Sequence, residues 1–297
     1  MAAAVKLGKE VIAAYADYEQ LVGGVDTLFK DSSQEIQRYA ANAYKTAGLS
    51  ANEYMETVTG FSASLIQSLG GDTEKAAKYA DMAITDMSDN ANKMGTDISS
   101  IQNAYQGFAK QNYTMLDNLK LGYGGTKQEM ERLLADAEKI SGVKYDISSY
   151  ADVVEAIHVM QESMDIAGTT AKEEEATISG SVNALKSAVS NLIVGFGDAD
   201  ADMELLCNNM VDAFKTVVAN ITPVIENIVA ALPTALDALL TAVGELLPTL
   251  LEAVTELFSQ VLETLLSLLP QLIPAAVSAL MTIVNTLIEN LPLLIEA

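Results

Sequence analysis

The chain has 297 residues, half of them apolar, with 17 Lys and Arg against 40 Asp and Glu and a net charge of −23. Because nucleic-acid affinity comes mostly from Lys and Arg that displace counterions from phosphate, this charge argues against tight or sequence-specific nucleic-acid binding. The single cysteine, Cys207, excludes an internal disulfide framework and a cysteine-based zinc site. Lys6, Lys9 and Glu10 interrupt the apolar run that a signal peptide needs, so we predict no export by the general secretory route.

Residues 1–195 have the pattern of successive helices, and we predict an all-α fold with this segment as a helical core region. No Pro interrupts residues 1–222, and no alternating β pattern competes with the helical one. Glycines divide the segment at intervals typical of helix ends. These predicted breakers are Gly23-Gly24, Gly48, Gly70-Gly71, Gly95, Gly122 to Gly125, Gly142 and Gly168.

Three of these breaks are followed by a capping box. In this motif a hydroxyl side chain accepts an early backbone N–H, and a carboxylate three residues later reaches back to the cap. The pairs are Ser50 with Glu53, Thr126 with Glu129, and Thr170 with Glu173. We therefore predict that a helix begins after each hydroxyl residue.

The last helix of this region has a short coiled-coil seam. Its apolar residues recur at spacings of 4, 3, 4 and 3, over about two heptads. The seam consists of Ile178, Val182, Leu185, Val189 and Leu192. The sequence VGFGDADAD then breaks the helical pattern, and we assign residues 196–222 to an acidic break and a connecting helix.

No group of residues in the sequence points to catalysis, a cofactor or a metal, and we predict a non-enzymatic protein without a cofactor. His158 is the only histidine, and its spacing from Glu162 favours a helix-surface pair over a metal site. The run DADAD at 198–202 resembles the opening of a calcium loop. However, Met203 and Asn209 stand where that loop needs Gly and Glu, so we favour an acidic helix start.

Two further features favour structural interpretations. The sequence GYGGTK at 122–127 lacks the spacing of a phosphate-binding loop, and we interpret it as a flexible connector with Lys127 in the first turn of a helix. Cys207 is spaced with Met203 and Met210 in an apolar pattern, which predicts inert packing rather than a nucleophile.

The C-terminal segment, 223–297, differs in composition from everything before it. All eleven tyrosines lie at or before Tyr150, all six prolines lie at or after Pro223, and the last basic residue is Lys215. Aliphatic pairs recur in it every eleven residues, a period of about 3.67 per helical turn that keeps an apolar stripe on one face. These pairs are Ile228-Val229, Leu239-Leu240, Leu250-Leu251, Val261-Leu262, Leu272-Ile273, Ile283-Val284 and Leu294-Ile295.

Prolines divide this segment, and we predict that they mark kinks or helix boundaries because each lacks a backbone N–H. The predicted positions are Pro223, Pro233, Pro248, Pro270, Pro274 and Pro292. Residues 264–288 contain no charge and meet the length of a membrane-spanning helix, but an oligomeric bundle in water would bury the same stripe. The candidate membrane-contact residues are Leu265, Leu269, Leu272, Ile273, Val277, Leu280, Ile283, Val284 and Leu287.

Over long continuous stretches of sequence, residues 11–215 resemble the tail tape measure proteins of long-tailed phages and prophages of Gram-positive bacteria. The resemblance lies in YADYEQLVGGVDTLFKDSS (15–33), in TTAKEEEATISGSVNALKSAVSNLIVG (169–195) and in the stretches 43–96, 101–142 and 145–162. The C-terminal segment resembles the family only in composition and rhythm. Family members are usually much longer, so we expect a fragment, a truncated prophage gene or a short version.

The resemblance implies a structural role in the virion tail. Family members lie as extended helical chains in several copies inside the tail tube, and their length sets tail length. The implied partners are other copies of the chain, tail tube subunits and tail assembly chaperones in the host cytoplasm. The host membrane is a further implied partner during genome ejection, when the hydrophobic part of the chain helps the genome to cross that membrane. On this basis we expect residues 15–215 to lie extended along the tube.

The alternative is a membrane-active or lipid-surface helical protein, either a pore-former or an apolipoprotein-like one. Amphipathic helices of about 22 residues that are separated by prolines favour the apolipoprotein comparison. The absence of Lys and Arg after Lys215 argues against it, because no cation is present there to meet phosphate headgroups.

Overall fold

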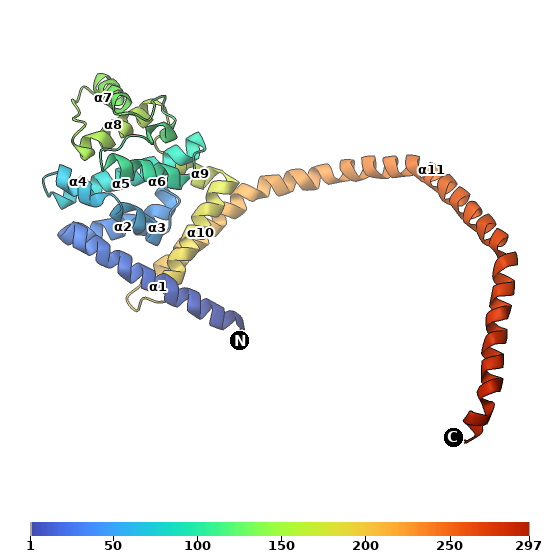
Figure 1. Cartoon of the computed structure of the whole chain (residues 1–297). Helices are drawn as coiled ribbons and strands as arrows, with labels where there is room; N and C mark the ends of the chain where they lie inside the picture. Colours follow the sequence, from blue (N-terminus) through green and yellow to red (C-terminus); the bar gives the residue numbers. More distant parts are fainter. Residues whose placement is uncertain (1, 297) are drawn as a thin grey trace. The chain divides into compact units, whose positions relative to one another are not determined.

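The computed structural model describes the backbone of residues 2–296 and the side chains of residues 6–270 and 272–286. No strand occurs in this described backbone, which confirms the all-α class. The chain divides into two units, Met1–Val224 and Ile225–Ala297, and the division lies close to residue 223, where the predicted C-terminal segment begins. In chain order the helices (Figure 1) are α1 (Ala2–Phe29), η1 (Lys30–Ser32), α2 (Ser33–Thr46), α3 (Ala51–Thr59), α4 (Ser62–Ser68), α5 (Thr73–Met94), α6 (Ile98–Phe108), η2 (Leu116–Leu119), α7 (Lys127–Ser141), α8 (Tyr150–Ser163), α9 (Thr169–Ala176), α10 (Ile178–Gly195) and α11 (Met203–Glu296).

Two of the predicted capping signals begin helices where expected. Ser50 Oγ accepts from the Glu53 backbone N–H at 3.4 Å, and the Glu53 carboxylate accepts from the Ser50 N–H at 2.8 Å, so α3 begins with a complete capping box. Thr126 Oγ1 accepts from the Glu129 N–H at 3.2 Å and begins α7. The Glu129 carboxylate accepts from the Gly124 N–H rather than from the cap, so only half of this box is present.

The third predicted capping box is wrong. Thr170 lies inside α9, whose N-cap position is Gly168. Asp89, a fully buried carboxylate on α5, performs the capping from another helix: it accepts the Thr170 N–H at 2.7 Å and the Gly168 N–H. A carboxylate at a helix N-terminus satisfies orphan N–H donors and is favoured by the helix dipole.

Among the glycines predicted to break helices, Gly23 and Gly24 do not do so. Both lie inside α1, which continues to Phe29. Glycine in a helix interior costs about 1 kcal/mol relative to alanine, and full burial of Val25 and Phe29 in the next turn offsets that cost. Gly48 behaves as predicted: it follows α2 with a φ of 66°, in the left-handed region that glycine adopts most easily.

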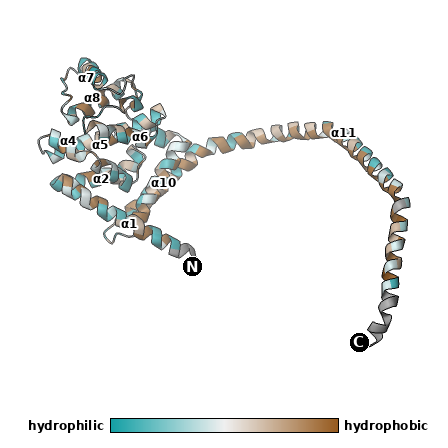
Figure 2. Cartoon of the chain, in the orientation of Figure 1, coloured by the Kyte–Doolittle hydropathy of each residue, from teal (hydrophilic) through white to brown (hydrophobic). Residues whose placement is uncertain are grey.

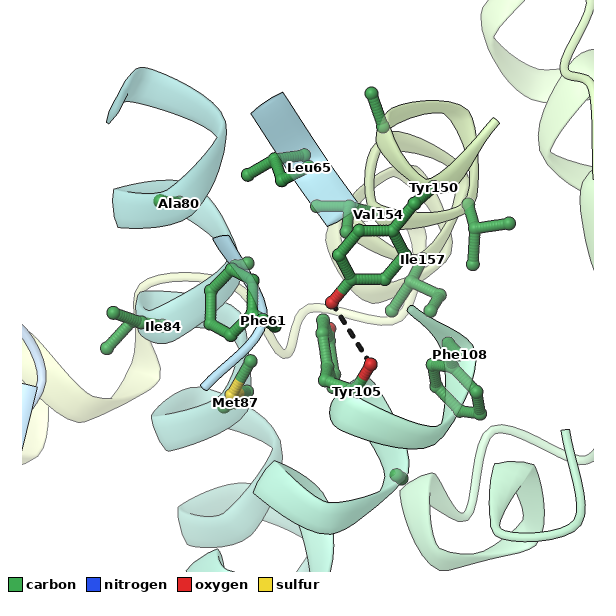
Figure 3. Close-up of a cluster of buried hydrophobic side chains, with 14 of the residues drawn as sticks. Phe61, Leu65, Ala80, Ile84, Met87, Tyr105, Phe108, Tyr150, Val154 and Ile157 are labelled. Carbon is green, nitrogen blue, oxygen red and sulfur yellow. Dashed lines mark hydrogen bonds between the residues drawn. The ribbon is translucent and has the colours of Figure 1, made fainter. Parts of the chain in front are cut away.

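The core of the first unit surrounds α5, which packs against α1, α2, α3, α4, α6, α8 and α9. Figure 3 shows side chains from α5, α6 and α8, together with Phe61 and Leu65, converging on one cluster. The Tyr105 and Phe108 rings on α6 lie 5.8 Å apart, and Tyr150 Oη on α8 donates to the Tyr105 carbonyl at 3.1 Å. Tyr150 thus fills the core and still satisfies its hydroxyl.

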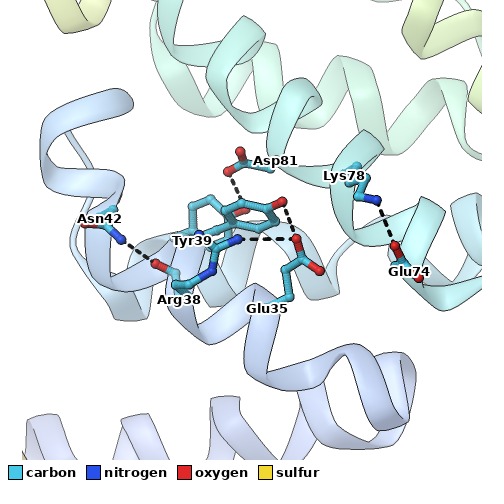
Figure 4. Close-up of polar contacts among 8 residues, drawn as sticks. Glu35, Arg38, Tyr39, Asn42, Glu74, Lys78 and Asp81 are labelled. Atoms are coloured by element: carbon cyan, nitrogen blue, oxygen red, sulfur yellow. Dashed lines mark hydrogen bonds and ion pairs between the residues drawn. The ribbon is translucent and has the colours of Figure 1, made fainter.

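At the edge of this core a polar contact connects α3 with α5, and further polar contacts lie within α2 (Figure 4). Tyr54 Oη on α3 donates to Asp81 on α5 at 2.8 Å. Burial raises the pKa of Asp81, and the hydrogen bond from Tyr54 opposes that shift. On α2, Tyr39 Oη and Arg38 both donate to Glu35, at 2.6 and 3.3 Å. Half-buried hydroxyl and carboxylate groups are therefore paired with one another.

Residues 15–215 fold back on themselves in the free chain, which does not test whether they lie extended inside a tail tube. The Ala51 N–H donates to Asn191 Oδ1 at 2.8 Å across 140 residues of sequence. Tyr79 Oη on α5 donates to Glu155 on α8 at 2.6 Å across 76 residues. Contacts of this range, together with the buried core, make the first unit a folded domain.

Candidate functional site

The first part of α11 belongs to the folded domain and packs against α10 and α2. Ala213 and Val217 are buried, and Ala213 joins Tyr44 of α2 and Ala184 of α10 in a small apolar cluster. Asn220 Nδ2 donates to the carbonyls at the end of α9 and the start of α10, at 3.2 and 3.0 Å. Residues 203–224 are thus attached to the domain by apolar and polar contacts.

The face by which α10 packs is not the predicted coiled-coil seam. Of the five seam residues only Leu192 is buried, and Ile178 at the start of the seam is exposed. The buried face consists mostly of small or polar residues, namely Ser181, Ala184, Ser187, Ala188, Asn191 and Gly195. Small side chains let neighbouring backbones approach closely, so the close packing of α10 on the domain uses this face.

From residue 225 onward, α11 exposes every side chain that the structure describes, up to residue 286. Figure 2 shows apolar residues recurring along its coloured length. At about 100° per residue, the columns that begin at Ile225, Ile228, Val229 and Leu232 fall within an arc of about 100°. The acids from Glu226 to Glu263 lie outside that arc. Over residues 225–270 and 272–286 the repeat therefore forms an apolar stripe that no other described part of the chain covers.

The candidate membrane-contact residues lie on this exposed helix. Leu287 lies outside the residues whose side chains are described. The others have exposed fractions of 51% for Leu265, 41% for Leu269, 56% for Leu272, 55% for Ile273, 54% for Val277, 61% for Leu280, 57% for Ile283 and 45% for Val284. By length and composition alone, Met203–Pro270 contains a stretch apolar enough to cross a membrane, and Leu272–Thr286 is a shorter apolar helix.

The prolines do not form helix boundaries, because α11 is continuous from Met203 to Glu296. Pro223, Pro233, Pro248, Pro270 and Pro274 all lie inside it, and the Pro292 side chain lies outside the described set. Each proline removes one i to i−4 hydrogen bond from the helix. Because every described side chain around these prolines from residue 225 on is exposed, solvent can reach the freed carbonyls. That these prolines kink the helix stays a prediction.

His158 on α8 has two acidic neighbours, of which the sequence indicated one. Its Nε2 lies 3.5 Å from Glu162 Oε1, as the spacing predicted, and its Nδ1 lies 2.9 Å from Asp86 Oδ1 on α5. The hydrogen bond with Asp86 raises the pKa of His158. Burial raises the pKa of Asp86 to about 6, although the bond with His158 opposes it. This pair of a half-buried His158 and a buried Asp86 connects α5 with α8.

The segment at 122–127 is ordered by contacts with α7 and is not the flexible connector that we predicted. Arg132 donates to the Gly122 carbonyl at 2.8 Å, and its guanidinium lies 4.4 Å from the centre of the Tyr123 ring. Tyr123 is buried, and its hydroxyl donates to Asp136 at 3.0 Å. Lys127 begins α7, as expected.

The acidic run at 198–202 begins a helix, as predicted. Asp202 Oδ1 accepts from the Leu205 N–H at 2.9 Å at the start of α11.

Cys207 is exposed, so the prediction that it packs inertly is wrong. Around the axis of α11, Cys207 points about 100° away from the side that carries the buried Ala213 and Val217. Within the described residues, no group of three or more His, Cys, Asp or Glu side chains could hold a metal ion.

The exposed apolar stripe of α11 is therefore the strongest candidate functional site. No protein-family model matches the chain, and no curated protein or solved structure matches it either.

Proposed function

We propose that the chain is a non-enzymatic scaffold of a phage tail that sets tail length from inside the tail tube. The observation that carries this proposal is the continuous helix α11, whose apolar repeat is exposed from residue 225 to residue 286. An apolar stripe of this length needs a partner in water. Other copies of the chain and the tail tube subunits are the partners that the resemblance to tape measure proteins implies.

In this proposal α11, rather than residues 15–215, measures length. The first unit is folded, so its contribution to tail length does not follow from its number of residues. The 94 residues of α11 account for about 140 Å of helix at 1.5 Å per residue. Any change in the number of eleven-residue repeats changes that length and leaves the apolar stripe in register.

Deletion of the 22 residues 249–270 tests the proposal. It joins Pro248 to Gln271 and so restores the Pro-Gln junction of the native sequence, with the columns in register. We expect tails shorter by about 33 Å, measured by electron microscopy of assembled particles. The matched control duplicates residues 249–270 and should lengthen tails by the same amount. Viable particles of unchanged length in both variants would show that α11 does not measure.

We further propose that the charge-free part of α11 enters the host membrane once the chain has left the tail. This role is supported by the exposure of its described apolar residues. Residues 216–297 carry eight acids and no Lys or Arg, so apolar burial has to drive insertion and anionic headgroups oppose it. Insertion into neutral liposomes should therefore exceed insertion into anionic ones.

The membrane role is tested by placing a charge in the charge-free run of the full chain. Leu280→Asp or Ile283→Asp should abolish a protease-protected fragment in neutral liposomes, at a cost of about 3 kcal/mol for the charge. Leu236→Asp lies in the same column as Leu280 but outside the charge-free run, and should leave protection unchanged. Lack of a protected fragment with the unaltered chain would refute the membrane role alone. The tail-length measurement is independent of it.

A further inference from the structure

The apolar columns of α11 begin inside the folded domain, where another helix covers them. Ala213 and Val217 are 7% and 8% exposed, and Ala213 packs against Ala184 of α10. Ile228 and Leu239 follow Val217 at intervals of eleven residues, yet they are 57% and 59% exposed. The same repeat position is therefore covered at its start and uncovered after residue 224. Continuity of the column predicts that a helix covers it further along as well.

The charges of α11 do not oppose such a cover. Between residues 225 and 286 all six acids, Glu226 to Glu263, lie between about 115° and 180° around the helix from the middle of the columns. If two such helices pack column to column, their acids point outward and lie roughly 20 Å apart or more. The Debye length at physiological ionic strength is about 8 Å, so the repulsion between these acids is largely screened.

The prolines determine which helix fits. Pro223, Pro233, Pro248, Pro270 and Pro274 lie within an arc of about 100° outside the apolar columns. Each is a predicted kink, and the intervals between them are unequal, at 10, 15, 22 and 4 residues. A straight partner helix would separate from α11 at these kinks. A second α11 that runs parallel without a shift has its kinks at the same five levels.

Other arrangements of two α11 helices lose this match. When residues 226–286 overlap in opposite directions with the columns facing each other, Pro248 lies at the level of Thr264 and Pro270 at the level of Ala242. A parallel pair shifted by whole repeats aligns at most Pro248 with Pro270, at a shift of 22 residues. The kinks coincide throughout only in the parallel pair without a shift.

We propose that α11 pairs with α11 of a second copy of this chain, parallel and in register, over residues 225–286. The inference rests on the proposed function, in which the stripe needs a partner, and it names that partner. The four columns supply about 20 residues on each chain, comparable with the roughly 20–30 residues a side of a stable protein complex. An eleven-residue period favours a gentle right-handed supercoil in such a pair.

Sedimentation equilibrium of the full chain at about 10 µM, tenfold above a micromolar dissociation constant, tests the pairing. The expected mass is that of at least two chains. Leu250→Asp places a charge in the exposed columns and should weaken association by about a hundredfold. Thr249→Asp adds the same charge at the neighbouring, outward-facing position and should leave the mass unchanged. Near-UV circular dichroism of the tyrosines, all at or before Tyr150, reports whether the domain of each variant is folded.

Disulfide cross-linking tests the orientation and the register. In a Cys207→Ser background, Leu247→Cys places a thiol in the columns and should give a covalent dimer under mild oxidation, because identical residues face each other. The antiparallel arrangement would hold the two introduced thiols about 27 Å apart along the axis. Glu245→Cys, on the outer face, is the matched control and should not cross-link.

Several outcomes would overturn the assignment. These are a monomeric full chain, equal association by Leu250→Asp, or cross-linking of Glu245→Cys as fast as that of Leu247→Cys. A monomer that inserts into neutral liposomes through the same columns would make lipid the occupant instead. Tail length separates this inference from the proposed function. A monomeric chain whose repeats still set tail length refutes the pairing alone, whereas an in-register pair with tails of unchanged length refutes the proposed function alone.

Discussion

Asp89 offers the sharpest test of how the domain is held together. Its carboxylate is fully buried on α5 and accepts the Gly168 and Thr170 N–H groups at the start of α9. Replacement by alanine leaves two N–H donors without a partner, at about 1–3 kcal/mol each. It also removes a negative charge from a helix N-terminus. We expect Asp89→Ala to lower the free energy of unfolding by about 3–5 kcal/mol.

Asp89→Asn retains one oxygen acceptor, so a smaller loss of about 1–2 kcal/mol is expected. Urea unfolding followed by tyrosine fluorescence measures both losses within the first unit, because the chain has no Trp and no Tyr after Tyr150. The matched control is Glu173→Ala. The capping box inferred from sequence would make Glu173 important, whereas the structure predicts a change within about 0.5 kcal/mol. A loss from Glu173→Ala as large as that from Asp89→Ala would refute the reasoning.

Three further predictions concern pH, glycine and cysteine. The pKa of Asp86 is raised to about 6 and that of His158 is also raised, so the folded state binds more protons than the unfolded state. The free energy of unfolding should therefore fall as pH rises from about 5 to 8, and Asp86→Asn should flatten that dependence in urea titrations. Gly48→Ala should lower the free energy of unfolding by at least about 1 kcal/mol, since φ is 66° and the new Cβ would lie 2.5 Å from Glu174 Oε1. Gly23→Ala, in open space inside α1, should instead raise it by up to about 1 kcal/mol in the same urea titrations. Exposed Cys207 should react fully with a thiol reagent under native conditions, and protection in the folded monomer would contradict its exposure.

The secondary-structure class and several helix ends follow from local sequence alone. The Ser50–Glu53 capping box and the helix break at Gly48 are confirmed because the atoms involved lie within a few residues of one another. The same reason explains the acidic start of α11 at Asp202. Interactions this local depend little on the rest of the fold.

Predictions failed where a distant helix supplied the deciding contact. Thr170 was expected to cap α9, but Asp89, 81 residues earlier, does so. Gly23 was expected to break a helix, but burial of Val25 and Phe29 keeps α1 continuous. Local propensities of about 1 kcal/mol are smaller than the gain from burying one large apolar side chain, so packing overrode them.

The candidate sites also differ in whether neighbouring residues or distant helices determine them. The apolar stripe of α11 follows from an eleven-residue period that any helix converts into one face, so its position was predictable. The His158–Asp86 pair was not, because it unites residues that are far apart in sequence. Only the packing of α8 against α5 brings these side chains together. Periodicity along one helix can be read from sequence, whereas contacts between helices depend on how their faces meet.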